Sequence, residues 1–202
     1  MIASMLVAIS YIAAQMLSDI ASLQIVQFIG LSIDAGTFIY PVTFTLRDLA
    51  HKTLGIKAVR VLIVSAAVIN LFMAGFFWLV AKMPPDELAG SSYKWGNVLS
   101  PVWRITIASI IAEIIAELTD TEVYRFWVTK ITKKYQWTRV LSSNLVSIPI
   151  DTFIFAFLAF YATMPTSSVM SIVWGNIIIK GVVTIISLPW IYFVRDRSFH
   201  NA

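Results

Sequence analysis

The sequence predicts an all-α membrane protein in which six transmembrane helices form one bundle. The 202 residues are 58% hydrophobic and only 13% charged, whereas soluble domains carry about 25% charged residues. The mean hydropathy is +0.81, and the apolar residues gather in segments long enough to cross a hydrocarbon core of about 30 Å. The length suits one domain, so we expect residues 1–202 to form a single integral membrane domain.

The apolar segments give the limits of the spans. We expect them at residues 2–18, 35–50, 60–81, 101–120, 140–160 and 170–194. The first has no basic start and is taken as a retained helix, not a cleaved signal peptide. Pro41 interrupts the second span and Pro149 lies near the middle of the fifth, and internal proline often marks a kink or a cavity. The more polar residues 20–34 predict an interfacial or re-entrant connection.

The basic residues predict the orientation. With six spans, 11 of the 15 Lys and Arg residues fall on one side, in the segments 47–60, 125–139 and 195–197. The other side holds Lys82, Lys94 and Arg104, and residues 82–100 form its longest connection, expected to be a solvated loop. Cytoplasmic loops carry the excess of Lys and Arg, so both termini are predicted to be cytoplasmic.

Ionisable residues lie near the predicted middle of the bilayer. Glu113, Asp151 and Lys180 lie about 15–18 Å along their helices, at about 1.5 Å per residue, and Glu117 follows Glu113 by one turn. A charge at the centre of a membrane helix costs about 2.5–3.5 kcal/mol on insertion scales. Such residues usually mark a substrate or ion pathway.

Polar residues recur every three or four positions on five of the spans, so each of these helices has one polar face. The stripes are Thr106, Ser109, Glu113, Glu117 and Asp120; Asn144, Ser147 and Asp151; Asn176, Lys180, Thr184 and Ser187; Thr37, Pro41, Thr45 and Asp48; and, more weakly, Tyr11, Gln15 and Ser18. Several polar faces in one small bundle predict a common internal cavity.

The charges of this cavity do not balance. A Lys180–Asp151 pair could be a structural bridge or part of a site, and the sequence leaves both open. That pair cannot also neutralise Glu113 and Glu117, which must be protonated, hydrated or matched by a ligand. A carboxylate suits a cation or a flat ligand edge with adjacent N–H donors. Aromatic walls for such a ligand are available at Phe38, Tyr40, Phe44, Phe153 and Phe155.

Several function classes lack their sequence signals. There is no cysteine and no GxxxxGK[ST] or HExxH motif, and the histidines are His51 and His200, at the predicted cytoplasmic edge and tail. We therefore expect no enzyme, no metal site and no cofactor. The net charge of +4 is explained by the cytoplasmic loops and does not predict nucleic-acid binding.

Four stretches resemble one known family, the VUT family, also called the queuosine precursor transporters. They are AGTFIYPVTFTLRDL (35–49), SIIAEIIAELTD (109–120), TRVLSSNLVSIPIDTFIFAFLAF (138–160) and KGVVTIISLPWIYFV (180–194). The resemblance covers nearly the whole chain, with departures at Pro149 and Leu54. It implies a six-helix importer in a prokaryotic inner membrane, for 7-cyano-7-deazaguanine and 7-aminomethyl-7-deazaguanine.

With that substrate, roles can be assigned to the polar residues as hypotheses. Glu113 and Glu117 would recognise the N–H donors of the base. Asn144, Asp151, Lys180 and Phe44 would line or organise the pocket, and Asp48 and Asp120 would serve exit or gating.

The energy source and partners stay open at this stage. The family is distantly similar to the S components of energy-coupling-factor transporters, so one alternative is a binding subunit for another small heterocycle or vitamin that needs ATPase partners. Ser10, Ala14 and Ser18 could form the helix contact with such a partner. A homo-oligomer is the other assembly that stays open. The alternatives are secondary transport, proton-coupled through Glu113 or Glu117, and a scaffold subunit that transports nothing.

Overall fold

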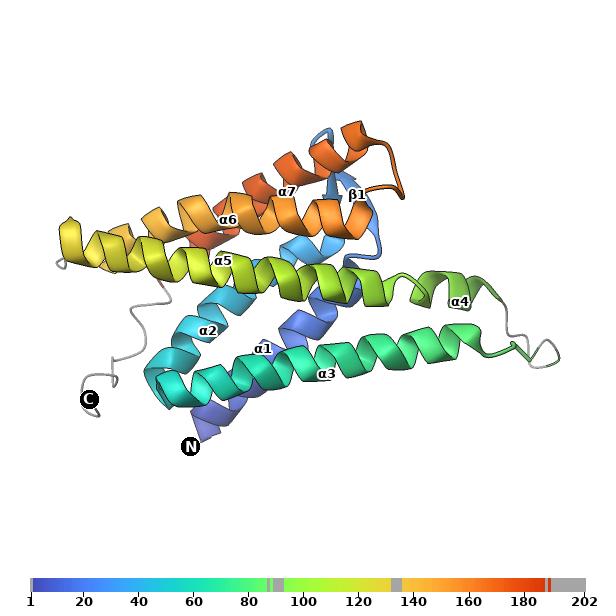
Figure 1. Cartoon of the computed structure of the whole chain (residues 1–202), viewed down its shortest axis with the longest axis horizontal. Coiled ribbons are helices and arrows are strands. Elements are labelled where there is room, and N and C mark those ends of the chain that lie inside the picture. Colours follow the sequence, from blue (N-terminus) through green and yellow to red (C-terminus); the bar gives the residue numbers. More distant parts are fainter. Residues whose placement is uncertain (1, 87, 89–92, 132–135, 188, 190–202) are drawn as a thin grey trace.

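The fold is a bundle of long helices with one small β-hairpin (Figure 1). The computed structural model describes residues 2–86, 88, 93–131, 136–187 and 189. In chain order the elements are α1 (Ile2–Ala21), β1 (Ile25–Phe28), β2 (Leu31–Asp34), the 3-10 helix η1 (Ala35–Phe38), α2 (Tyr40–Leu54), α3 (Ile56–Lys82), α4 (Tyr93–Leu99), α5 (Val102–Lys130), α6 (Gln136–Phe160) and α7 (Thr166–Ser187).

Five helices of the described chain are long and apolar enough to cross a membrane. The candidate spans are Ser4–Ala21, Lys57–Lys82, Lys94–Thr119, Leu141–Phe160 and Thr166–Ser187. They confirm a helical multi-pass protein. The second predicted span, 35–50, is not among them, because α2 has only 15 residues and carries several charges. The count of six and the cytoplasmic termini stay predictions.

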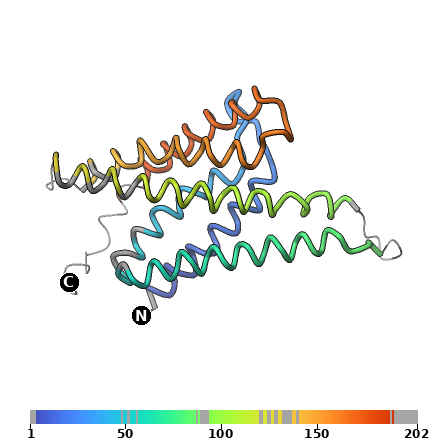
Figure 2. Tube along the Cα trace, in the orientation of Figure 1, coloured from blue at the N-terminus to red at the C-terminus, as the bar shows by residue number. Residues whose placement is uncertain are grey.

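The path of the chain is nevertheless that of an up-and-down bundle. In Figures 1 and 2, α2 runs back towards the end of the bundle at which α1 begins, and the end of α7 lies at that same end. The helices form an N-terminal group, α1–α3, and a C-terminal group, α5–α7, lying side by side. Every connection through the bundle therefore reverses the chain direction, as the predicted topology requires.

Small buried residues allow the helices to pack closely. In the C-terminal group, Ala108 and Ala112 of α5 share a buried cluster with Ala156 and Ala159 of α6. In the N-terminal group, Tyr11 of α1 packs in a cluster with three fully buried small side chains, Ala50, Val59 and Ala66. Membrane helices associate largely through such close packing, since lipid offers no hydrophobic drive between them.

The connection predicted at 20–34 is an ordered antiparallel hairpin. Its register pairs Ile25 with Asp34 and Phe28 with Leu31. The two turn residues, Ile29 (φ 51°) and Gly30 (φ 79°), both have positive φ, as a two-residue type I′ turn requires. The turn places β2 against α7, where Ser32 N donates a hydrogen bond to Ser171 Oγ at 3.0 Å.

Both prolines highlighted by the sequence are accommodated. Pro41 is the second residue of α2, a first-turn position at which the missing N–H removes no helical bond, so it begins this helix and does not interrupt it. Pro149 lies inside the continuous helix α6.

Within the connection 82–100 the structure adds a short helix, α4. Residues 188 and 190–194 of the last predicted span lie outside the described residues.

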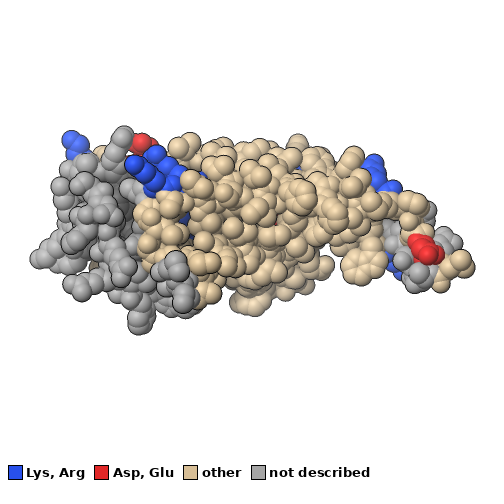
Figure 3. All heavy atoms as spheres, turned by 90° about the horizontal axis from the view of Figure 1, so that it is seen from below, with Lys and Arg blue, Asp and Glu red and all other residues tan. Residues whose placement is uncertain are grey.

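The surface agrees with a position in a bilayer. On the face shown in Figure 3, the described charged residues lie towards the two ends, and a belt without charged residues separates them. Many large apolar side chains of the described helices are exposed, including Leu6, Phe72, Leu118, Leu145 and Ile186. An apolar patch of that extent is expected where lipid, not water, surrounds the protein.

Candidate functional site

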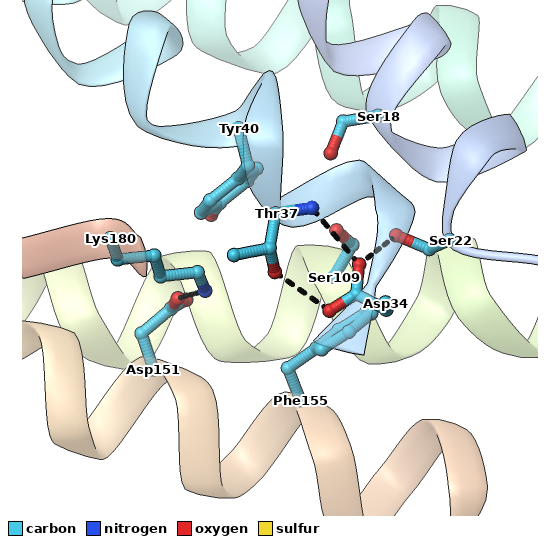
Figure 4. Close-up of a pocket in the computed structure, with 9 residues that line it drawn as sticks. All are labelled: Ser18, Ser22, Asp34, Thr37, Tyr40, Ser109, Asp151, Phe155 and Lys180. Atoms are coloured by element: carbon cyan, nitrogen blue, oxygen red, sulfur yellow. Dashed lines mark hydrogen bonds and ion pairs between the residues drawn. The ribbon is translucent and has the colours of Figure 1, made fainter. Parts of the chain in front are cut away.

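A small polar pocket lies between the two helix groups (Figure 4). It is lined by residues of α1, β2, η1, α2, α5, α6 and α7, namely Ser18, Ser22, Asp34, Thr37, Tyr40, Ser109, Asp151, Phe155 and Lys180. Its volume of about 10 Å³ is about the room that one water molecule needs. In this conformation the pocket therefore has no room for a larger ligand, although its walls are rich in donors and acceptors.

The ion pair of the pocket joins α6 to α7. Lys180 Nζ lies 2.6 Å from Asp151 Oδ2, and both side chains are buried. The same ammonium group lies 4.6 Å from the ring centroid of Tyr40 and 6.0 Å from that of Phe155. Aromatic faces attract cations, so the lysine is held by one carboxylate and by two rings that flank the pocket. Two predicted site residues, Asp151 and Lys180, are thus brought together.

A second carboxylate, Asp34, lies on the other side of the pocket and was missed by the sequence analysis. It accepts hydrogen bonds from Ser22 Oγ (2.6 Å), Thr37 N (3.1 Å), Thr37 Oγ1 (2.7 Å) and Asn176 Nδ2. All of these donors are uncharged. Among the described residues no Lys or Arg forms an ion pair with Asp34.

Local chemistry explains why Asp34 takes this position. It is the N-cap of η1, and its carboxylate satisfies the free N–H of Thr37, as Asp does at many helix starts. An Asp followed three residues later by Thr37 is a sequence signal for the start of a helix. Asp34 is, however, the last residue of the segment 20–34, which the sequence predicts to be a connection. The pocket also uses Tyr40, which the sequence analysis named only as an aromatic wall.

Glu113 lies outside the lining of the pocket, in a hydrogen-bond network with α1. Tyr11 Oη donates to Glu113 Oε1 at 2.9 Å, and Gln15 Nε2 lies 2.9 and 3.0 Å from the two carboxylate oxygens. Asn70 of α3 lies 3.5 Å from Gln15 Oε1. The polar stripes predicted on α1 and α5 therefore face each other.

Glu117 is matched by a cation of the protein itself. Arg47 Nη1 of α2 lies 3.5 Å from Glu117 Oε1, and the guanidinium lies 5.5 Å from the ring centroid of Phe44. Arg47 therefore balances the negative charge of Glu117, one turn beyond Glu113, which the sequence alone left without a partner. Asp34, not these two glutamates, supplies the second carboxylate of the pocket.

Two other predicted site residues do not line the pocket. Phe44 and Asn144 are half-buried on α2 and α6 and are absent from the pocket lining. Asp48 and Asp120 belong to α2 and α5, and their side chains lie outside the part of the chain that the structure describes. No group of three or more His, Cys, Asp or Glu suited to a metal occurs among the described residues.

Two comparisons relate the chain to known proteins. A curated protein of Bacillus subtilis (strain 168), the "Probable queuosine precursor transporter", is 27% identical over 184 residues, which are 87% of this chain and 78% of the relative. No solved structure matches the chain at a significant level. Residues 34–194, from Asp34 of the pocket through α7, match the family described as "Putative vitamin uptake transporter". The chain therefore belongs to this vitamin uptake transporter family.

Proposed function

We propose that the protein imports queuosine precursors, 7-cyano-7-deazaguanine and 7-aminomethyl-7-deazaguanine, across the inner membrane of a prokaryotic cell. The observation that carries the proposal is the buried pocket in which Asp34 and the Lys180–Asp151 pair lie with Tyr40 and Phe155. The family membership supports membrane transport. The name of the Bacillus subtilis relative supports this class of substrate.

The polar groups of the pocket complement the edge of a guanine-like base. Such a base presents a ring N–H and an exocyclic NH₂ beside a carbonyl oxygen. A carboxylate can accept the two parallel N–H bonds, and an ammonium can donate to the carbonyl. Asp34 or Asp151 would take the first role and Lys180 the second. In this conformation these groups bind one another or neighbouring side chains, so a ligand would replace existing hydrogen bonds.

The aromatic rings suit the flat faces of the same ligand. Tyr40 and Phe155 approach the pocket from α2 and α6. Because the present volume suits only a water molecule, entry of a base requires these walls to separate. The pocket lies between the two helix groups, and a change in their spacing would open it. Ligand sites between packed helices are common in membrane transporters.

The sequence predicts that Glu113 and Glu117 bind the N–H donors of the base, whereas this proposal assigns that role to Asp34 or Asp151. The two glutamates lie beside the pocket, in contact with Tyr11, Gln15 and Arg47, and direct contact with the base stays a prediction. Transport without chemical conversion of the substrate accords with the family, so we propose no enzymatic role.

Thermal unfolding of the purified protein in detergent tests the proposal. A ligand that binds only the folded state raises the unfolding midpoint. At a ligand concentration 100 times the dissociation constant, the gain in the free energy of unfolding is about 2.7 kcal/mol. We expect 7-cyano-7-deazaguanine to raise the midpoint of the wild type, and Asp34→Asn and Asp151→Asn to lose the shift relative to their own unliganded midpoints. Asp86→Asn, in an exposed loop, is the control and should keep it.

Two results would contradict the proposal in different ways. If no deazaguanine shifts the wild type at any soluble concentration, this substrate class is wrong. If the wild type responds and both pocket variants respond equally, the base binds elsewhere, and Glu113→Gln and Glu117→Gln become the variants to test.

A further inference from the structure

A third buried carboxyl group, Asp19, lies beside the pocket and takes no part in its ion pair. Asp19 is 4% exposed, near the end of α1, and its neighbours Ser18 and Ser22 line the pocket. Across the helix interface it faces Thr106 and Ser109 of α5. Ser109 itself lines the pocket. One α5 residue therefore touches both Asp19 and the proposed substrate site.

The oxygen atoms at this position are not satisfied. Asp19 Oδ2 has no hydrogen-bond partner, and neither has Thr106 Oγ1, whose residue is 0% exposed. Buried polar groups are nearly always hydrogen-bonded, so an unpaired oxygen on a buried carboxyl group calls for an explanation. Among the described residues, no Lys, Arg or His forms an ion pair with Asp19.

The surroundings also disfavour a negative charge. On either side of Asp19 along α1, Met16 and Leu23 pack against the apolar cluster of Met73, Ala74 and Val102. The carboxyl group of Asp34, at the wall of the neighbouring pocket, carries the same sign of charge. Lys180 and Arg47 already pair with other carboxylates, Asp151 and Glu117.

We infer that Asp19 binds a proton and that its protonation is coupled to occupation of the pocket; this inference rests on the proposed transport function. The protonated carboxyl group is neutral, so one proton removes the charge of a buried carboxylate that no cation balances. When the pocket opens to water, the same group can lose the proton and become hydrated.

A proton fits this position better than a metal ion. A bound cation such as Na⁺ or Ca²⁺ needs several oxygen ligands and the room to hold them. Neither Asp19 nor Thr106 is among the residues that line the cavity. A proton needs no volume and one acceptor beyond its own carboxyl group.

Ser22 and Ser109, which line the pocket, connect Asp19 to the proposed substrate site. Ser22 Oγ donates to Asp34 Oδ1 at 2.6 Å, and Ser109 lies between Asp19 and the pocket. A base that takes over the bonds of Asp34 would release Ser22 and move α1 relative to α5. Because Asp19 lies on the same turns of α1, opening the pocket changes its access to water. Glu113, in contrast, already accepts three hydrogen bonds.

Proteoliposomes that contain only this chain test the inference, with radiolabelled 7-cyano-7-deazaguanine, no ATP and no Na⁺. Two activities are compared: counterflow, which exchanges substrate without net proton movement, and accumulation driven by a pH gradient. With one proton per substrate, a gradient of about one pH unit should accumulate substrate about tenfold in the wild type. Asp19→Asn, which mimics the neutral side chain, should keep counterflow and lose accumulation.

Asp86→Asn is the matched control and should keep both activities. Accumulation by Asp19→Asn equal to that of the wild type overturns the inference, as does a wild type that shows counterflow but no response to the pH gradient. A wild type that neither binds nor exchanges the deazaguanine contradicts the proposed function instead. The two failures are therefore distinguishable.

A second variant covers the case in which Asp19→Asn does not fold. Asp19→Glu keeps the carboxyl group but moves it along the α1–α5 interface. It should shift the pH at which accumulation is half-maximal, because the proton then has different partners. If Asp19 had only a structural role, Asp19→Glu would lower the amount of folded protein and leave that pH unchanged.

Discussion

Asn176 and Asp34 bind each other in both directions. Asp34 N donates to Asn176 Oδ1 at 3.3 Å, and Asn176 Nδ2 donates to Asp34 Oδ2. The pair ties β2 to the middle of α7, and it holds the carboxylate of Asp34 at the wall of the pocket. The hairpin is therefore anchored at the position where its last residue becomes part of the proposed site.

Asn176→Asp should destabilise the protein because it places two carboxylates in contact and removes the amide donor. A buried group that loses its hydrogen-bond partner costs about 1–3 kcal/mol, and more if it is charged. We expect a lower midpoint in thermal unfolding and a weaker response to the deazaguanine. Asn97→Asp, on the exposed side of α4, is the control. An unchanged midpoint for Asn176→Asp would show that the pair contributes little.

The Lys180–Asp151 pair can be tested for a structural or a binding role. Lys180→Met leaves a buried carboxylate without its cation, and breaking a buried pair in this way costs about 3–5 kcal/mol. The double variant Lys180→Met, Asp151→Leu removes both charges, so most of the lost stability should return. Unfolding midpoints of the two single variants and the double variant measure this coupling.

Ligand binding by the same double variant separates the two roles. The proposed function predicts that it folds but gives no thermal shift with 7-cyano-7-deazaguanine. If the double variant is stable and still binds the base, the pair serves only to join α6 to α7.

The network around Glu113 makes a prediction about α1. Gln15→Leu removes the donor that reaches both oxygens of Glu113, and we expect a loss of about 1–3 kcal/mol of stability. In Glu113→Gln the charge is already absent, so adding Gln15→Leu should cost less. A double-mutant cycle measures the difference. Gln24→Leu, at an exposed position, should change little, and equal costs of Gln15→Leu in both backgrounds would exclude coupling.

The helical spans and their polar faces could be predicted from the periodicity of the sequence. The part of the site that depends on the hairpin and on η1 could not. Hydropathy located five spans, and the spacing of polar residues placed Gln15, Asp151 and Lys180 inside the bundle. The partners of Glu113 and Glu117 were not predictable, because they depend on how α1 and α2 are rotated against α5. Asp34 was missed because a hairpin and a 3-10 helix carry no helical period.

Close packing of the hairpin on α7 gives the last prediction. A Cβ atom at Gly175 would lie 2.6 Å from Ile33 Cγ1 and 2.7 Å from the backbone oxygen of Ser32, so Gly175→Ala should push β2 away and disturb Asp34. At Gly181, on the same helix, a Cβ atom would meet nothing within 4 Å. Gly181→Ala should therefore be neutral or stabilising, since Ala favours a helix over Gly by about 0.5–1 kcal/mol.

Thermal unfolding with and without the deazaguanine compares these two alanine variants. Gly175→Ala should lower the midpoint and reduce the ligand-induced shift, while Gly181→Ala keeps both. Because the two changes add the same methyl group to the same helix, a difference between them reports the hairpin contact and not helix propensity. If both variants bind the base equally, the position of β2 does not control the pocket.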